Sequence, residues 1–458
     1  PQIIFKENAI KDFVAKLPFS LTNSQKMAAW EIIKDLQKDQ PMNRLLQGDV
    51  GSGKTVVGAM CAYDAVLNNY QVILMAPTEI LASQHYESFV NLFGNTNVKI
   101  ALYTRSKTEL NFNSDIADYM SLPAKKKYIG GKTKKGEINI IVGTHALLSE
   151  KVEFKKLGFV IVDEQQRFGV EQRHIIREKS GNASIMPHFL SMTATPIPRS
   201  FALTIYGDLD ISIIKGLPPG RKVIKTRLVA GFNRQKAYDF IRAQVKIGRQ
   251  IFVVCPLIDN LENMEVALQS GSGQAYGLDK KSVLSEYEKL SKQIFPDLKI
   301  GYLHGKLKSE EKDEVMKKFL NKELDILIST SVIEVGVDIS NASVMMIEGA
   351  DRFGLAQLHQ FRGRVGRSSY QSYCFLFTDS ESEKSLERLS FFEKNNYGFK
   401  LAEFDLSERG PGEVYGTAQS GVLRFKFAGI YDFGIIKSAR ELARGLDFSK
   451  YPTLKNKV

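Results

Sequence analysis

Short, continuous apolar runs alternate with longer segments of helical periodicity along most of this 458-residue chain. Four such runs stand out in the first half: Gln71–Thr78, Ile138–Thr144, Phe159–Glu164 and His188–Thr195. Strands with one solvated face alternate apolar and polar residues, whereas continuous apolar runs are typical of strands buried on both faces of a parallel sheet. The alternation therefore predicts an α/β fold with right-handed crossover helices.

The same alternation restarts beyond Gly216–Lys222, where adjacent prolines and flanking glycines favour a linker. Strands are predicted at Val223–Val229, Gln250–Leu257, Lys299–His304, Leu324–Ser331, Ser343–Glu348 and Ser372–Thr378. The helices between them are predicted at Asn233–Ile247, Ser282–Ile294, Ser309–Leu320 and Leu355–Arg362. The chain is too long for one ordinary core. We therefore expect one α/β domain over 1–219, a second over 220–385, and a helical C-terminal part over 386–458, with a ligand in the cleft between the domains.

Charge and cysteine content restrict the class of protein. The net charge of +12 favours a polyanionic partner such as nucleic acid, although a lysine-rich proteome would produce the same excess. No apolar run approaches the roughly 18 residues of a membrane helix, and the N-terminus lacks the layout of a signal peptide. Cys61, Cys255 and Cys374 lie in apolar runs, which is typical of reduced core residues. We expect a cytoplasmic protein without a membrane partner, and the missing initial Met suggests a piece of a longer one.

The segment Gly48–Thr55 has the spacing of a phosphate-binding loop between a strand and a helix. Its glycines are Gly48, Gly51 and Gly53. Glycines let backbone N–H groups close around phosphate oxygens, and the following helix N-terminus favours anions. Lys54 is expected to reach the outer phosphates, and Thr55 to ligate Mg²⁺. The segment predicts ATP and Mg²⁺ as ligands.

Asp163 and Glu164 end a buried strand farther along the chain. After a phosphate-binding loop, this is the expected place for an Asp that holds Mg²⁺ through water and for a Glu that polarises the attacking water. An acidic pair at a strand end is commonplace by itself, so this interpretation depends on the loop.

Gln25 lies just before the phosphate-binding loop, where an amide donor and acceptor suit the edge of adenine, and Phe19 could stack on the ring. The alternative is a simple helix start capped by Thr22 or Asn23.

Arginines cluster in Gln357–Ser368. Arg364 and Arg367 are three residues apart and so project from one side of a helix end, from which guanidinium groups can enter a phosphate site. The alternative is a basic helix end that faces solvent. Arg362 has no assigned role.

Lysines gather at Lys125–Lys127, Lys132, Lys134 and Lys135, in what we expect to be a loop. The cluster either grips DNA phosphates or is a solvated insertion.

Seven ordered motifs together resemble a superfamily 2 nucleic-acid helicase. The motifs are Gly48–Thr55, Ala76–Ala82, Gly143–Leu148, Asp163–Gln166, Ser191–Thr195, Ser329–Asp338 and Gln357–Ser368. Longer segments resemble the RecG branch-migrating DNA helicases in particular. These segments are Asp163–Arg173, Met192–Arg199, Tyr206–Asp210, Leu217–Arg221, Arg352–His359, Asp405–Glu413 and Gln419–Gly421. Gln166 and Ala418 depart from the family pattern, which more often has His and Arg there.

The resemblance implies two RecA-like domains with a C-terminal hairpin, and an ATP-driven DNA translocase that acts on branched DNA in repair and recombination. It assigns Gln25 to adenine, Arg364 and Arg367 to arginine fingers, and Gly336 and Asp338 to the nucleotide. The positions implied to track DNA are Thr78, Thr144, His304 and Thr330, and those of the coupling hairpin are Arg388, Arg409 and Gln419. The implied partner is duplex or branched DNA, with a single-stranded-DNA-binding protein as a further candidate, and the implied state is a monomer. A transcription-repair coupling translocase, or a nucleotide-gated DNA-binding module without motor activity, are the alternatives.

Overall fold

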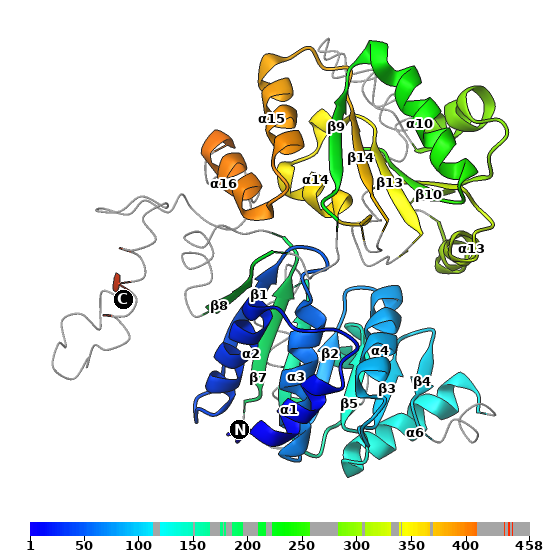
Figure 1. Cartoon of the computed structure of the whole chain (residues 1–458). Helices are drawn as coiled ribbons and strands as arrows, with labels where there is room; N and C mark the ends of the chain where they lie inside the picture. The colour runs from blue at the N-terminus through cyan, green and yellow to red at the C-terminus, as the bar shows by residue number, and fades with distance from the viewer. Residues whose placement is uncertain are drawn as a thin grey trace, which may run out of the picture.

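The computed structural model describes most of the chain. The described residues are 1–112, 120–149, 152–164, 175–176, 178–179, 186–195, 209–216, 222–256, 283–304, 307–330, 339, 341–366, 370–409, 435, 438–439 and 442. They form two α/β lobes, one below the other in Figure 1, and the second lobe carries two further helices at its side.

The first lobe is built on an eight-stranded sheet in the order β4-β3-β5-β2-β6-β7-β1-β8. The strands are β1 (Asn43–Gly48), β2 (Gln71–Met75), β3 (Ile100–Tyr103), β4 (Thr108–Leu110), β5 (Ile140–Gly143), β6 (Leu157–Asp163), β7 (His188–Thr193) and β8 (Asp210–Ile214). Neighbouring strands are parallel except for the edge pair β3–β4, which is antiparallel. The four predicted strands are confirmed as β2, β5, β6 and β7, and the strand expected before the phosphate-binding loop is β1. Strands β3, β4 and β8 are additional.

Helices cover both faces of this sheet, which explains why its strands are apolar throughout. The helices are α1 (Glu7–Ala15), α2 (Asn23–Leu36), α3 (Lys54–Leu67), α4 (Glu79–Phe93), α6 (Leu122–Lys135) and α7 (Ala146–Ser149). One core lies under α1 to α4 and includes Ile32, Val57 and Phe89. A second core on the other face includes Ile129 of α6 and Leu147 of α7.

The second lobe has a six-stranded, wholly parallel sheet in the order β11-β12-β10-β13-β14-β9. Its strands are β9 (Lys225–Val229), β10 (Gln250–Val254), β11 (Ile300–Leu303), β12 (Ile326–Ser329), β13 (Ala342–Ile347) and β14 (Tyr373–Phe377). Its helices are α10 (Arg234–Lys246), α12 (Val283–Lys289), α13 (Ser309–Leu320) and α14 (Leu355–Arg362), and a π-helical turn, Leu290–Ile294, continues α12. All six predicted strands and all four predicted helices are present, with bounds shifted by a few residues.

Two helices follow the second sheet and form a hairpin: α15 (Glu383–Lys394) and α16 (Gly398–Arg409). Phe391 of α15 stacks on Phe404 of α16 with ring centroids 4.0 Å apart. Leu389 and Leu401 belong to the same buried cluster as α14, so the hairpin is part of the second lobe's core. In Figure 1 the hairpin lies on the side of this lobe away from α10 and α13.

The lysine-rich segment is a helix, so the expectation of a loop was wrong. Pro123 stands in the first turn of α6, where proline is tolerated, and Gly136 ends the helix with φ 77°. Lys132 forms an ion pair with Glu137, and Lys134 forms one with Glu153 at 2.6 Å.

The three cysteines are free and buried, as predicted. No helix in the described part of the chain is long and apolar enough to cross a membrane.

Candidate active site

The phosphate-binding loop joins β1 to α3 at the carboxyl edge of the first sheet. Gly51 and Gly53 have φ 76° and 90°, values that side chains with a Cβ rarely adopt. Lys54 begins α3 and turns back over the loop, where its Nζ donates to the carbonyl oxygens of Gly48 (2.8 Å) and Asp49 (3.1 Å). The ammonium group is therefore held at the centre of the loop.

Gln25 supports the loop from α2. Its Oε1 accepts from the Thr22 N–H (2.8 Å), completing a capping box, and its Nε2 donates to the Ser52 carbonyl (2.8 Å). A Cβ at Gly53 would lie 2.1 Å from this Nε2, so glycine is required there for steric reasons as well. Thr22 is thus the helix cap, and Gln25 is bound to the loop; Phe19 is about half exposed and lines the same cleft.

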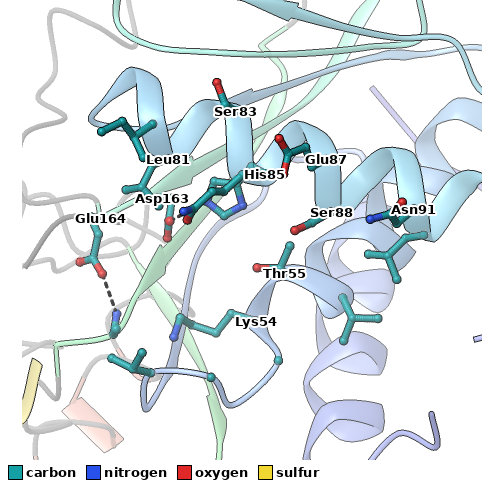
Figure 2. Close-up of a pocket in the computed structure, with 18 of the residues that line it drawn as sticks. Lys54, Thr55, Leu81, Ser83, His85, Glu87, Ser88, Asn91, Asp163 and Glu164 are labelled. Atoms are coloured by element: carbon teal, nitrogen blue, oxygen red, sulfur yellow. Dashed lines mark hydrogen bonds and ion pairs between the residues drawn. The ribbon is translucent and has the colours of Figure 1, made fainter. Parts of the chain in front are cut away.

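Asp163 ends β6 beside Lys54 and is hydrogen-bonded to His85 of α4, with 2.8 Å between Nε2 and Oδ2. Figure 2 shows His85 reaching from α4 toward Asp163, with Thr55 and Lys54 at the start of α3 below α4 in this view. Burial alone would raise the pKa of Asp163, but the hydrogen bond and charge of His85, together with Lys54 and Arg364, lower it. Asp163 is therefore held as a carboxylate. His85 was not predicted; the only local signal was a histidine one helical turn after Leu81, on the face that turns inward.

Glu164 follows at a left-handed position, φ 55°, and turns toward the end of β7. Its Oε1 accepts from the Ala194 N–H, and its Oε2 from the Thr193 hydroxyl, both at 3.2 Å. Figure 2 marks the first of these bonds. Burial and the neighbouring charge of Asp163 raise the pKa of Glu164. Two adjacent carboxyl groups thus have pKa values shifted in opposite directions, which is a common property of catalytic pairs.

The second lobe contributes Arg364, which is buried two residues after the end of α14 and lines the same cleft. Burial lowers the pKa of Lys54; Asp163 and Glu164 offset this in part, and the positive charge of Arg364 adds to the lowering. Arg364 is thus within electrostatic reach of the loop lysine and of both carboxylates.

These residues line a cleft of about 1290 Å³ between the lobes. The described residues contain no group of three His, Cys, Asp or Glu side chains that could hold a metal ion. Mg²⁺ does not need such a group, because it takes one or two protein oxygens and completes its shell with phosphates and waters. The Asp163 carboxylate and the Thr55 hydroxyl are suitable oxygen donors, and both line this cleft from the first lobe.

The two lobes touch directly at the phosphate-binding loop. His359 Nε2 lies 3.0 Å from Asp49 Oδ1, and a Cβ at Gly363 would lie 2.7 Å from Val50 Cβ. On the other side of the cleft, Ile80 of α4 packs against the core of the second lobe.

The four residues expected to track DNA all follow strands at the carboxyl edges of the two sheets. Thr78 and Thr144 follow β2 and β5, where their hydroxyls accept from the N–H groups of Leu81 (3.3 Å) and Ala146 (3.4 Å). His304 and Thr330 follow β11 and β12, and the His304 ring stacks on Tyr302. Ligands of open α/β sheets bind at this edge.

Arg388 of α15 donates a hydrogen bond to the Asp351 carbonyl and so ties the hairpin to the second lobe. Arg409 is the last residue of α16. Arg367, Gly336, Asp338 and Gln419 lie outside the described residues, as do Gln166 and Ala418.

Comparison with known proteins agrees with this geometry. Residues 23–203 match the DEAD/DEAH box helicase family and residues 234–369 match the helicase conserved C-terminal domain. The chain is 46% identical to the ATP-dependent DNA helicase RecG of Thermotoga maritima over 438 residues (95% of this chain, 52% of the relative). It is 45% identical to that of Aquifex aeolicus, covering 100% of this chain and 54% of the relative. The chain thus spans about half the length of these curated relatives.

Among solved structures, a RecG bound to a three-way DNA junction is similar over 95% of this chain and 53% of its own, with 41% identity and a TM-score of 0.76. Mss116p bound to single-stranded RNA and AMP-PNP shares the fold over 86% of this chain and 76% of its own, with 17% identity and a TM-score of 0.58.

Two RecA-like lobes, with a phosphate-binding loop in the first and a cleft-lining arginine in the second, define a superfamily 2 helicase core. More narrowly, the chain is a RecG-type helicase core.

Proposed function

We propose that this chain is the ATP-driven motor of a RecG-type DNA helicase. One observation carries the proposal: Lys54, Asp163 and Glu164 of the first lobe share a single cleft with Arg364 of the second. A site assembled from both lobes changes when the lobes open or close, so that hydrolysis can be coupled to movement.

The proposed reaction is in-line attack of water on the γ-phosphate of ATP. The Lys54 side chain moves so that its ammonium group leaves the loop carbonyls and binds the outer phosphates. Gln25 and Phe19 contact adenine. Glu164 accepts the proton of the attacking water, and Arg364, with Arg367, stabilises the charge that spreads over the transferred group. Asp163 and Thr55 would hold Mg²⁺, which supplies further positive charge at the phosphates; Gly336 and Asp338 would lie near the nucleotide.

DNA is the proposed partner. The net charge of +12 favours a polyanion, and a related structure is described as RecG bound to a three-way DNA junction. Thr78, Thr144, His304 and Thr330 would contact the backbone, which suits a motor that ignores base sequence. The hairpin residues Arg388, Arg409 and Gln419 would couple hydrolysis to movement on branched DNA.

ATP hydrolysis measured with and without DNA tests the proposal. We expect the rate to rise at least tenfold with a three-way junction, and less with linear duplex of the same length. Arg364→Ala should remove this stimulation. Arg227→Ala serves as a control, because Arg227 is an exposed arginine of the same lobe whose ion pair in the described part of the chain is a long one, 3.5 Å, with Glu393. A nucleotide-gated binding module would instead bind DNA and ATP without stimulated turnover, and that result would refute the motor.

A further inference from the structure

Three polar side chains form a buried line from the phosphate-binding loop into the second lobe. Asp49 Oδ1 lies 3.0 Å from His359 Nε2, and His359 Nδ1 lies 3.0 Å from an Arg362 NH2 nitrogen. The other guanidinium nitrogen, NH1, donates to the carbonyl oxygens of Phe392 (3.2 Å) and Asn395 (3.0 Å). Asp49 and Arg362 belong to different lobes, and His359 is hydrogen-bonded to both.

The chemistry of the line determines the state of the imidazole. A guanidinium group donates hydrogen bonds and cannot accept them, so His359 Nδ1 must be the acceptor. The ring proton is then on Nε2 and is donated to the Asp49 carboxylate. Burial and the charge of Arg362 lower the pKa of His359, and the hydrogen bond to Asp49 offsets this only in part, so the neutral ring is favoured. In this state every polar atom of the ring is used.

The line ends at the turn between the two hairpin helices. Phe392 is in the last turn of α15, Asn395 follows that helix, and Gly398 begins α16. Arg362 also lies over the Phe392 ring, 4.1 Å from its centroid. A Cβ at Gly398 would lie 2.6 Å from Asp49 Oδ1 and 2.8 Å from His359 Nε2. The start of α16 therefore packs directly against the Asp49–His359 pair. This packing is a second contact between the pair and the hairpin, and it does not involve Arg362.

Under the proposed function, binding of a nucleotide changes the contacts of the phosphate-binding loop. Lys54 donates to the Asp49 carbonyl here, and it leaves that carbonyl when it turns to phosphate. A shift of Asp49 changes its hydrogen bond to His359. Because His359 and Arg362 are only 6% and 2% exposed, water cannot easily replace the lost partner.

We propose that His359 is a positioning residue that links the nucleotide state of the phosphate-binding loop to the α15–α16 turn. The link runs through Arg362 and through the close packing of Gly398 on the Asp49–His359 pair. The inference rests on the proposed motor function and deepens it. It assigns a role to Arg362, for which the sequence suggested none. It also makes Asp49 the residue of the loop whose position His359 responds to.

Two substitutions at one position separate the two halves of the line. The amide oxygen of Asn can replace Nδ1, so His359→Asn keeps the acceptor for Arg362 and loses the contact with Asp49. The amide nitrogen of Gln can replace Nε2, so His359→Gln keeps the donor to Asp49 and loses the acceptor for Arg362. Gly398→Ala pushes a methyl group into the pair, and Gly354→Ala is its control, because a Cβ at Gly354 meets only Asp405 Oδ2 at an ordinary 3.8 Å.

The decisive measurement is hydrogen–deuterium exchange of residues 392–398 with and without a non-hydrolysable ATP analogue. We expect the analogue to change exchange there in the wild-type chain and in Gly354→Ala, but not in His359→Asn, His359→Gln or Gly398→Ala. Each of these three variants should also lower kcat of DNA-stimulated hydrolysis about tenfold while KM for ATP changes less than threefold. A merely structural histidine would lower the unfolding temperature and leave the nucleotide response of this turn intact.

The outcomes distinguish the two proposals. A wild-type nucleotide response of the turn in His359→Asn overturns the link, whatever the rates. A wild-type chain that shows no DNA-stimulated hydrolysis refutes the motor function instead, and the exchange experiment still decides on the link.

Discussion

Replacement of Glu164 by Gln tests the assigned chemistry most directly, because the structure predicts separate effects on folding and on turnover. The Ala194 N–H cannot change its role, so the new amide must present its oxygen to that group. Its nitrogen then faces the Thr193 hydroxyl, which can accept because it can donate to Thr195 Oγ1 at 2.5 Å. No buried group loses its partner. We therefore expect the free energy of unfolding to change by less than about 1 kcal/mol.

Turnover should respond very differently. An amide cannot take a proton from water, and loss of a general base lowers a rate by about 10²–10⁴-fold, or about 3–5 kcal/mol in the activation free energy. Nucleotide affinity should be kept or increased, since one negative charge near the phosphates is removed. The assay is single-turnover hydrolysis together with equilibrium binding of ATP.

Glu164→Ala is the matched comparison for this prediction. It also removes the base, but it leaves the Ala194 N–H without an acceptor, so its unfolding free energy should fall by about 1–3 kcal/mol. If Glu164→Gln hydrolyses ATP within tenfold of the wild-type rate, Glu164 is not the base.

Three other predictions concern the first lobe. Gln25→Ala should reduce the preference for ATP over GTP about tenfold in titration calorimetry; an equal loss for both nucleotides would assign Gln25 to loop support alone. Burial raises the pKa of Asp64 to about 6, from 3.8 in the unfolded chain, so its contribution to stability is full below about pH 4 and is lost as the pH rises through about 6. Asp64→Asn should remove this part of the pH dependence in urea unfolding, and an unchanged profile would contradict the assignment. Lys132→Gln and Lys134→Gln should leave the salt dependence of DNA binding unchanged, because both lysines already pair with carboxylates; a flatter salt slope would show that α6 contacts phosphate.

The sequence predicted much of the architecture, because a buried parallel strand has a local signature. Continuous apolar runs such as Phe159–Glu164 and Ser343–Glu348 became β6 and β13 with small shifts at their ends. The edge strands β3 and β4 have no such signature, because they are short and pair on an edge that only the fold defines. The lysine-rich segment was mistaken for a loop because glycines at 130 and 131 lower helix propensity, yet Ile129 is buried against the sheet and this packing stabilises α6.

The positions of the phosphate-binding loop and of the Asp163–Glu164 pair at a strand end were predictable from the sequence alone, because each is a short segment with a local pattern. Partners that lie far apart in the chain were decided only by the tertiary structure. His85 meets Asp163 because α4 packs beside the end of β6, and His359 meets Asp49 across 310 residues because the two lobes close on each other. Spacing along the chain encodes a helix, a strand or a loop, but the pairing of polar groups between elements depends on how their apolar faces pack.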